Sequence, residues 1–388
     1  MSTATLSLPK GGGTVQGLGA DLQASPFRGT ARLTIPIALP QGRGASPALS
    51  LLYESNGGNG PFGAGAAVAL PSLVLSTATG VPTYTDADPV VFSEVGLLAE
   101  KGDWTAGRWV PSERTVEDAG GTAWRVHEFL PRLQGTFPLI ERWTRVDDST
   151  SHWRTVSADN VESRFGVSAQ SRIADPERPW QVFEWLLEEV VDANGNRARY
   201  RYKAEDDQGA RRRPGSGANR YVERILYGNH PDGETAAYAF EVVFDYGEYD
   251  LDDLDKPAAD PYRPVRPWPA REDGFSSYRS GFELRTNRLC RGILTFHRFP
   301  AELGAEPCLT AATRFDYTPS PYLSCLRGVT QHGYRRAPDG SYRTEALPPV
   351  ELGFAGFDPP PAPAFRRLEV EREADLPGYL APGAYQPI

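Results

Sequence analysis

The chain alternates short runs of apolar and polar residues, a period of two that is typical of β-strands with one buried face. The first clear example covers residues 31–37, and the turn at residues 42–44 leads into a second run at 49–53. Residues 66–75 form a continuous apolar stretch interrupted by Pro71, which predicts a strand buried on both faces. We therefore expect an extended lead-in over residues 1–30 and strands from residue 31 onward.

Strand patterns continue along most of the remaining chain. They occur at residues 122–129, 139–146, 152–156, 181–187, 197–202, 222–227, 237–246, 281–294, 313–317, 326–334 and 350–354. Residues 182–191 also fit a helical pattern with Glu184, Glu188 and Glu189 on one face. The turn residues at 192–196 directly follow this stretch and favour a strand that ends in a hairpin. The prediction is a mainly β fold with many antiparallel strands and hairpins.

Three segments interrupt the strand pattern. Residues 203–220 are charged and rich in glycine, and residues 248–273 are first acidic and then rich in proline, so we predict surface loops for both. The run at 358–363 contains four prolines and predicts a stiff spacer. We expect a β domain over residues 31–357, followed by a Pro-rich linker and a truncated C-terminal tail over residues 358–388.

Composition narrows the classes of protein further. Among 388 residues, 39 are Gly and 35 are Pro, which leaves little room for long helices. The net charge of −9 argues against nucleic-acid binding, and the chain lacks an apolar run long enough for a membrane span. Residues 1–13 show no Sec-type signal peptide. Cys290, Cys308 and Cys325 are widely spaced and indicate buried thiols rather than disulfides or a zinc site.

Few residue patterns suggest chemistry. The five histidines, His127, His152, His230, His297 and His332, do not follow a metal-ligand spacing. The glycine-rich residues 56–65 lack the lysine of a phosphate loop and predict a tight turn. Glu371 and Glu373 have the Glu-x-Glu spacing of mono-ADP-ribosyltransferases, although a solvated run of charges is favoured.

Two further stretches have a chemical and a structural interpretation. Clustered carboxylates could bind Ca²⁺ at Asp250, Asp252, Asp253 and Asp255, but the run lacks the glycine and terminal glutamate of an EF-hand loop, and a solvated loop is favoured. Aromatic and arginine residues alternate at 275–283, where stacking on bases is less favoured than packing on a sheet. We therefore predict no catalytic, cofactor-binding or metal-binding residue.

Several separated segments resemble one family. They are residues 8–13, 49–55 with 58–63, 192–196 with 200–202, 275–286 with 288–290, 330–334 and 347–350. In this order they are similar to the SpvB domain, which forms the N-terminal part of Salmonella virulence protein SpvB and of the TcB subunits of insecticidal Tc toxin complexes. The resemblance implies a large curved, shell-like sheet of the Rhs/YD type.

The resemblance also implies a role without catalysis. In Tc toxins, TcB and TcC form a hollow β-sheet shell around a toxic segment, and TcB docks on the TcA pore. Our leading hypothesis is a non-enzymatic shell or carrier module of a bacterial toxin, with TcC-like and TcA-like subunits or a downstream effector domain as partners. The alternatives are an accessory domain of an actin-modifying ADP-ribosyltransferase toxin and a stand-alone adhesive β module. The family implies synthesis in the bacterial cytoplasm followed by secretion.

The resemblance ends about where TcB would enter its docking propeller, so we expect this chain to be only part of a Tc subunit. An isolated piece of a shell should expose unpaired strand edges. We therefore expect self-association or poor solubility when the chain is made alone.

Overall fold

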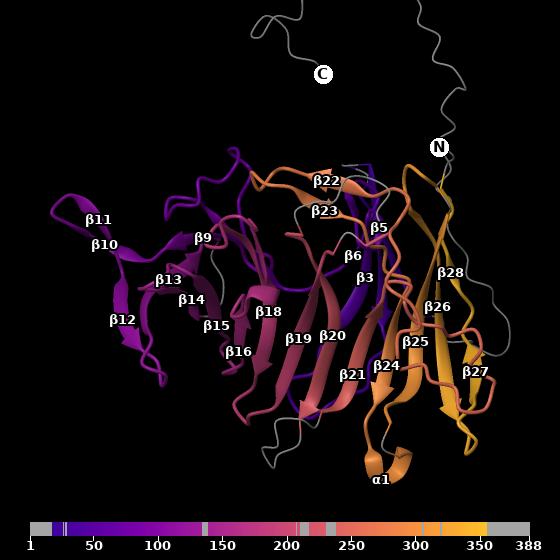
Figure 1. The fold of residues 1–388 in the computed structure, drawn as a ribbon. Helices are drawn as coiled ribbons and strands as arrows, with labels where there is room; N and C mark the ends of the chain where they lie inside the picture. The colour runs from indigo at the N-terminus through magenta and orange to yellow at the C-terminus, as the bar shows by residue number, and fades with distance from the viewer. Residues whose placement is uncertain are drawn as a thin grey trace, which may run out of the picture. The chain divides into compact units, whose positions relative to one another are not determined.

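The computed structural model describes residues 18–25, 27, 29–133, 139–206, 208–209, 217–229, 238–304, 306–318 and 320–354. The chain divides into two units, residues Met1–Leu352 and Gly353–Ile388, and every helix and strand of the described residues belongs to the first unit. All of the strand pairs are antiparallel, and the predicted mainly β fold is confirmed (Figure 1).

Eight strands close a barrel through successive antiparallel pairs. In ring order they are β9 (Gly96–Glu100), β13 (Ala123–Pro131), β14 (Leu139–Arg145), β15 (Ser151–Val156), β16 (Glu162–Phe165), β18 (Val182–Val191), β7 (Ser72–Leu75) and β8 (Val90–Phe92), which returns to β9. Aromatic side chains fill the barrel: the ring centroids of Phe92 and Phe165 lie 5.5 Å apart, and those of Phe129 and Trp153 lie 4.9 Å apart. The barrel is therefore a packed core, as expected for eight strands.

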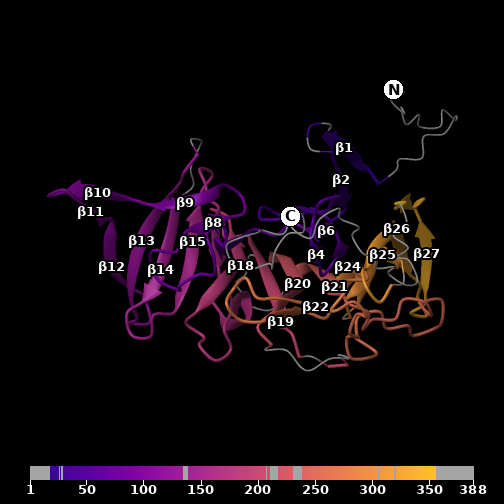
Figure 2. The ribbon, with the colours of Figure 1, turned by 90° about the horizontal axis from the view of Figure 1, so that it is seen from above.

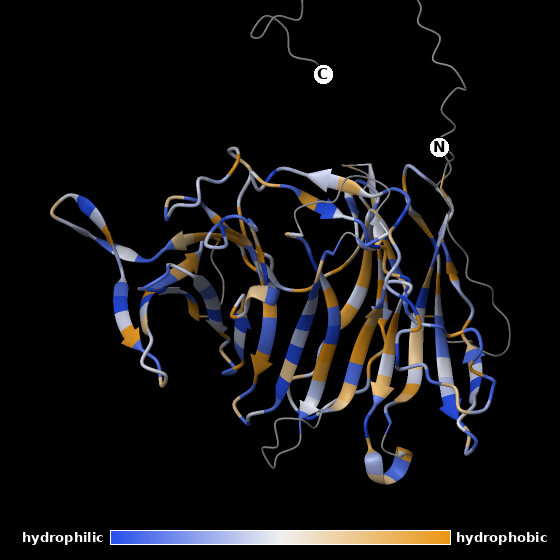
Figure 3. Cartoon of the chain, viewed as in Figure 1, coloured by the Kyte–Doolittle hydropathy of each residue, from blue (hydrophilic) through white to orange (hydrophobic). Residues whose placement is uncertain are grey.

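Strand β18 also belongs to an open sheet. Its residues 184–186 pair with β7, whereas residues 189–191 pair with β19. From β18 the open sheet continues through β19 (Arg197–Ala204), β20 (Arg220–Asn229), β21 (Tyr238–Asp245), β24 (Gly292–His297), β25 (Cys308–Thr318) and β26 (Cys325–Arg336). At its edge β26 pairs with β27 (Tyr342–Ala346) and β28 (Val350–Glu351). Figure 3 shows hydrophobic and hydrophilic residues alternating along these strands.

A smaller sheet covers one side of the large sheet. It is formed by β1 (Asp21–Ser25), β2 (Thr30–Ile37), β3 (Leu49–Glu54) and β6 (Ala66–Val68). Ile35 and Leu51 of this sheet are almost fully buried in the same hydrophobic core as Ile225 and Phe244 of the open sheet. Figure 2 shows β1 and β2 on one side of the large sheet. Burial of these apolar side chains on both layers joins the two sheets.

The remaining elements are short. They are β4 (Asn59–Gly60), β5 (Gly63–Ala64), β10 (Gly102–Thr105), β11 (Arg108–Pro111), β12 (Glu113–Glu117), β17 (Arg172–Ala174), β22 (Phe275–Ser277), β23 (Leu284–Thr286), the 3₁₀ turn Ala169–Ser171 and α1 (Pro300–Leu303). Strands β10, β11 and most of β12 are exposed. Their sequences consequently lack the strong apolar alternation from which strands are predicted.

The structure corrects four sequence predictions. Residues 66–75 form two strands in different sheets, because Pro71 falls between β6 and β7. Strand β1 lies inside the predicted lead-in. Residues 281–294 were predicted as one strand, but only β23 and the start of β24 are extended there. The intervening Arg288 is fully buried and bonded through its side chain.

The fourth correction concerns the two predicted surface loops. In the first, Glu205 is only 5% exposed. In the second, Tyr249 and Leu254 are buried in a hydrophobic cluster on the open sheet, and Trp268 is 2% exposed. These segments carry enough buried side chains to form part of the core. The predicted strand at 182–191 is confirmed, and the hairpin turn after it contains Gly195 with a φ of +79°.

Candidate functional site

Three aspartates of the acidic run at 250–255 form ion pairs with basic side chains. Asp250 lies 3.8 Å from Arg266, and Asp253 lies 2.7 Å from Lys256. Asp252 bonds to Arg314 at 3.3 Å. Within the described ranges, no group of three or more His, Cys, Asp or Glu side chains is arranged to hold a metal ion. The helices of the described part of the chain include none long and apolar enough to cross a membrane.

The histidines lie at separate places in the fold. His127 bonds to Glu100 and Glu113, whereas His297 packs edge-on against Phe240 and His332 stacks on Tyr334. His152 lies between two tryptophans, with ring centroids 4.8 Å from Trp124 and 5.9 Å from Trp143. Burial, with Arg164 and Arg172 nearby, lowers the pKa of His152 to about 4. His230 lies outside the described residues.

The cysteines and the Glu-x-Glu pair add no reactive group to the described part of the molecule. Cys290, Cys308 and Cys325 are free thiols, and the first two are buried. Burial raises the pKa of Cys290 well above its usual value, which disfavours the nucleophilic thiolate. Glu371 and Glu373 lie outside the described residues, as does the proline run at 358–363.

Residues 58–63, which carried part of the family resemblance, are bonded to Arg271, Cys290 and Tyr317. We call these contacts, together with the buried side chains around them, the signature junction. Arg271 donates from Nη1 to the carbonyl of Gly60 at 2.7 Å. The amide of Cys290 donates to the carbonyl of Pro61 at 2.7 Å. The hydroxyl of Tyr317 donates to the carbonyl of Cys290 at 2.8 Å and lies 3.2 Å from that of Phe62.

A buried ion pair lies at the centre of the signature junction. Arg271 and Asp273 are 2.7 Å apart, and neither side chain is exposed. Asp273 also accepts bonds from the amide and hydroxyl of Ser324, at 2.6 and 2.8 Å. Although burial alone would raise it, the bonds from Arg271 and Ser324 lower the pKa of Asp273 to about 2. The buried polar residues of this segment thus bind the chain to itself.

A second buried arginine completes the junction. Arg288 is fully buried and bonds to Glu205 at 2.6 Å and to Asp206 at 2.7 Å. It also donates to the carbonyl of Trp268 at 2.8 Å and lies over the Trp268 ring at 4.4 Å. These buried bonds make Arg288 a structural clamp between the loops that carry Glu205 and Trp268.

A row of ion pairs, which we call the charge ladder, crosses several strands of the large sheet. It runs through Arg114, Glu141, Arg154, Glu162, Arg164, Glu189 and Arg199, on strands β12, β14, β15, β16, β18 and β19. Successive pairs lie 2.8, 3.1, 2.7, 2.6, 3.6 and 3.1 Å apart. Arg197 also contacts Glu189, at 3.1 Å.

The two charges of the ladder differ in exposure. The side chains of Glu141 and Glu189 are 2% and 11% exposed, whereas Arg114 is 48% exposed. Partial burial would raise the pKa of Glu141, but hydrogen bonds from Arg114, Trp143 and Arg154 lower it overall. The ladder therefore presents guanidinium groups to solvent over buried carboxylates. Such a face suits contact with an acidic surface, and it brings no nucleophile to a cavity.

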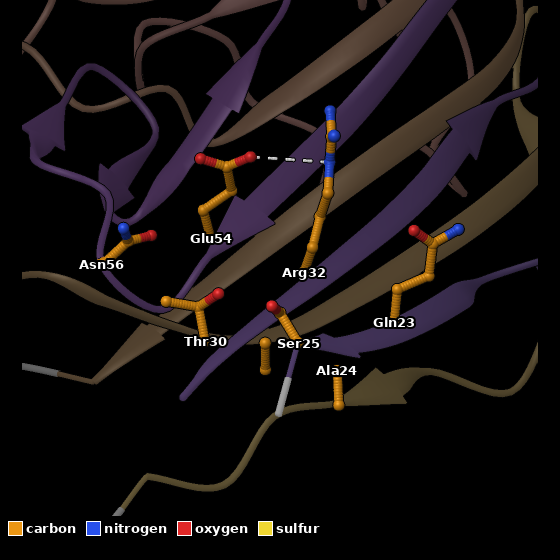
Figure 4. Close-up of a pocket in the computed structure, with 8 residues that line it drawn as sticks. Gln23, Ala24, Ser25, Thr30, Arg32, Glu54 and Asn56 are labelled. Atoms are coloured by element: carbon orange, nitrogen blue, oxygen red, sulfur yellow. Dashed lines mark ion pairs between the residues drawn. The ribbon is translucent and has the colours of Figure 1, made fainter. Parts of the chain in front are cut away.

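A shallow polar pocket lies on the smaller sheet. It has a volume of about 310 Å³ and is lined by residues of β1, β2 and β3 (Figure 4). Figure 4 shows Arg32 and Glu54 side by side, and their ion pair measures 3.5 Å between half-exposed side chains. The other lining residues, among them Gln23 and Ser25, are small or uncharged. The pocket lacks a buried titratable group and offers little beyond a weak surface ion pair.

Reasoning from the sequence missed the charge ladder and the buried arginines. The available signal was the i, i+2 spacing of charged residues within strands, as at Arg197, Arg199 and Arg201, which places like charges on one face. Which glutamate lies opposite these arginines cannot be predicted from the sequence, because the register between strands is set by the fold.

Family models, curated proteins and solved structures all point to the same family. The family model described as "SpvB: Salmonella virulence plasmid 65kDa B protein" matches residues 25–299. The "Mono(ADP-ribosyl)transferase SpvB" of Salmonella choleraesuis is 34% identical, over 87% of this chain and 60% of that protein. The chain thus spans about 60% of the length of the curated relatives that it matches.

Two solved structures have the same fold. The N-terminal domain of effector protein SpvB from Salmonella typhimurium strain LT2 is 32% identical, with a TM-score of 0.69 over 78% of this chain and 98% of that one. The TcdB2–TccC3 crystal structure is also 32% identical, with a TM-score of 0.76 over 92% of this chain and 18% of that one. The predicted resemblance is confirmed.

Proposed function

The chain belongs to the SpvB family, and from that premise we propose that it is a non-enzymatic shell or carrier module of a bacterial toxin. As a member of this family it is a toxin-associated module. The finer proposal is that its open sheet forms part of a larger β-sheet enclosure around a toxic effector. Its partners would then be TcC-like and TcA-like subunits, or an effector domain within the same polypeptide.

The observation that carries the proposal is the match to TcdB2–TccC3 over 92% of this chain but only 18% of that one. A fold that makes up one part of a much larger assembly has to continue into neighbouring structure. The open sheet offers a place for this, because the outer side of β27 and β28 has no strand partner within residues 18–354 as described. Unpaired edges readily accept another strand.

The polar residues also support a role without catalysis. Three buried charged side chains, Arg271, Asp273 and Arg288, hold the signature junction together, and of these only Arg288 lies in a segment that carried the family resemblance. The charge ladder is an extended surface rather than a convergent pocket. Both features suit a module that contacts other protein surfaces.

The decisive test is the intact mass of the natural product, isolated under native conditions together with whatever co-purifies. We expect either a polypeptide much larger than 42.5 kDa that contains these peptides, or a 42.5 kDa chain bound to a large partner. A solitary 42.5 kDa protein with no partner would contradict the shell proposal. Turnover by the purified chain, abolished by a single side-chain substitution, would contradict the non-enzymatic part.

A second candidate is favoured by the curated relatives. Because the chain is 34% identical to a mono(ADP-ribosyl)transferase over 60% of that protein, it could serve as the accessory N-terminal region of an actin-modifying toxin of that kind. Peptide mapping of the natural product separates the two. Transferase sequence after residue 388 supports the second candidate, and further shell repeats support the first. A stand-alone adhesive module would instead bind target cells as the isolated chain.

A further inference from the structure

A pocket of about 370 Å³ lies on the outer face of the open sheet, where β19, β20 and β21 are covered by the segment that contains Tyr262. Three arginines and a single glutamate line it: Arg201, Arg224, Arg298 and Glu241. It is distinct from the shallow pocket of Figure 4 and lies beyond the end of the charge ladder at Arg199. Its charged lining carries two positive charges in excess, in a chain with a net charge of −9.

The single negative charge of Glu241 balances the charge of only one of the three arginines. Its side chain is 1% exposed, and Arg298 bonds to it from Nε at 2.8 Å and from Nη2 at 2.5 Å. Arg224 bonds to the other oxygen of the same carboxylate. Both guanidinium groups lie over the Tyr262 ring, at 5.3 and 5.2 Å from its centroid. These contacts fix the two arginines in place at the pocket wall.

Arg201 has no such partner. It is exposed, and within the described part of the chain it makes neither a hydrogen bond nor an ion pair. In the register of β19 and β20 it stands directly opposite Arg224. Like charges in this position repel each other and destabilise a sheet. Folding thus holds an unneutralised guanidinium beside two that are already oriented, and an anion would relieve the repulsion.

We infer that this pocket binds a phosphate group, with Arg201 as the residue that decides affinity and Arg224 and Arg298 as its fixed neighbours. A phosphate monoester carries −1.5 to −2 charges at neutral pH, which matches the excess of two. Guanidinium groups bind phosphate oxygens through paired N–H donors. The volume lies within the usual range for small-ligand sites, and Leu226, Tyr238 and Tyr262 give it apolar walls. The inference is independent of the proposed shell role.

The test is calorimetric titration of the full chain with inorganic phosphate and, separately, with glucose 6-phosphate, at constant ionic strength set by chloride. We expect saturable binding that chloride does not reproduce. Tighter binding of the sugar phosphate would assign the site to an organic phosphate, and equal binding would assign it to phosphate itself. No saturable binding of either probe below about 10 mM would overturn the inference.

Arg201→Gln is the discriminating variant. Because Arg201 has no partner in the described structure, its removal should leave the unfolding temperature unchanged or slightly higher, while the Kd for phosphate rises at least about tenfold. Arg199→Gln is the matched control, since Arg199 lies on the same strand but pairs with Glu189 outside the pocket. Its Kd should stay within about twofold of wild type. Equal Kd values for Arg201→Gln and wild type would contradict the site.

Discussion

Single residues at the signature junction have little freedom to change. Gly63 has a φ of +89°, and a Cβ atom there would lie 2.7 Å from the carbonyl oxygen of Ser324 and 2.9 Å from the Tyr317 ring. Both the backbone conformation and the neighbouring backbone therefore require glycine. Gly58, five residues earlier in the same turn region, has an ordinary φ and open space around the Cβ position.

We predict that Gly63→Ala lowers the free energy of unfolding by more than about 1 kcal/mol, since alanine at positive φ is strained and here also meets backbone. Gly58→Ala should be neutral or slightly stabilising. Urea denaturation followed by tryptophan fluorescence measures both variants. Equal stabilities for the two would show that the junction can shift to accept a side chain at position 63.

Only part of this junction, residues 58–63 and 288–290, was singled out from the sequence, and no structural role was assigned to these residues. The glycine-rich stretch at 56–65 was correctly predicted as a turn, because its composition alone dictates that geometry. The clamp formed by Arg288 could not be predicted, because Glu205 is 83 residues away and the two meet only through folding. The loop that carries Glu205 was predicted as a surface segment for the same reason, since charged residues are buried only when a distant partner is available. Arg288 was placed in a predicted strand.

The stability of the folded protein depends on pH through the titration of His152, which lies on β15 in the barrel wall. In the folded protein its pKa is about 4, below the ordinary value of 6.5. Between pH 6.5 and pH 4 the imidazole is therefore protonated in the unfolded chain but mostly neutral in the folded one. The stabilisation is fully present above pH 6.5 and is lost as the pH falls toward 4. The loss amounts to at most about 3 kcal/mol.

A His152→Phe variant keeps an aromatic ring between Trp124 and Trp143 and removes the titration. We expect its free energy of unfolding to change less between pH 6.5 and 4 than that of the wild type, with the difference growing steadily as the pH falls. Parallel pH profiles for the two proteins would contradict this assignment. Chemical denaturation at half-unit pH steps resolves the difference.

At the level of elements, prediction succeeded best where more and less buried residues alternate along a strand. Strands β2, β3, β18 and β19 were predicted because alternation there reflects the pleat directly. Strands β14, β20 and β21 were also predicted, although their burial does not alternate regularly. The exposed strands β10 to β12 were missed because neither face is strongly apolar. The charge ladder was missed for a related reason: most of its pairs join different strands, and register cannot be read from single strands.

For the whole molecule, the arrangement of strands predicts how the isolated chain behaves. The barrel closes on itself, but the open sheet ends at β27 and β28. On β27 the amide of Tyr342 donates to the carbonyl of Leu254, away from β26. Because backbone groups alternate in direction along a strand, the amide of Thr344 also points away from β26, toward the open edge.

We predict that the isolated chain self-associates through this edge and that Thr344→Pro reduces the association. Proline removes the outward amide but leaves the bonds between β26 and β27, so stability should change little. Light scattering at increasing concentration should show a rising mass for wild type and a mass near 42.5 kDa for the variant. Glu345→Pro is the contrasting variant: it removes an amide directed at β26, opposite Gly333, and should lower stability. A monodisperse wild-type monomer would contradict the prediction and would mean that this edge is protected in the isolated chain.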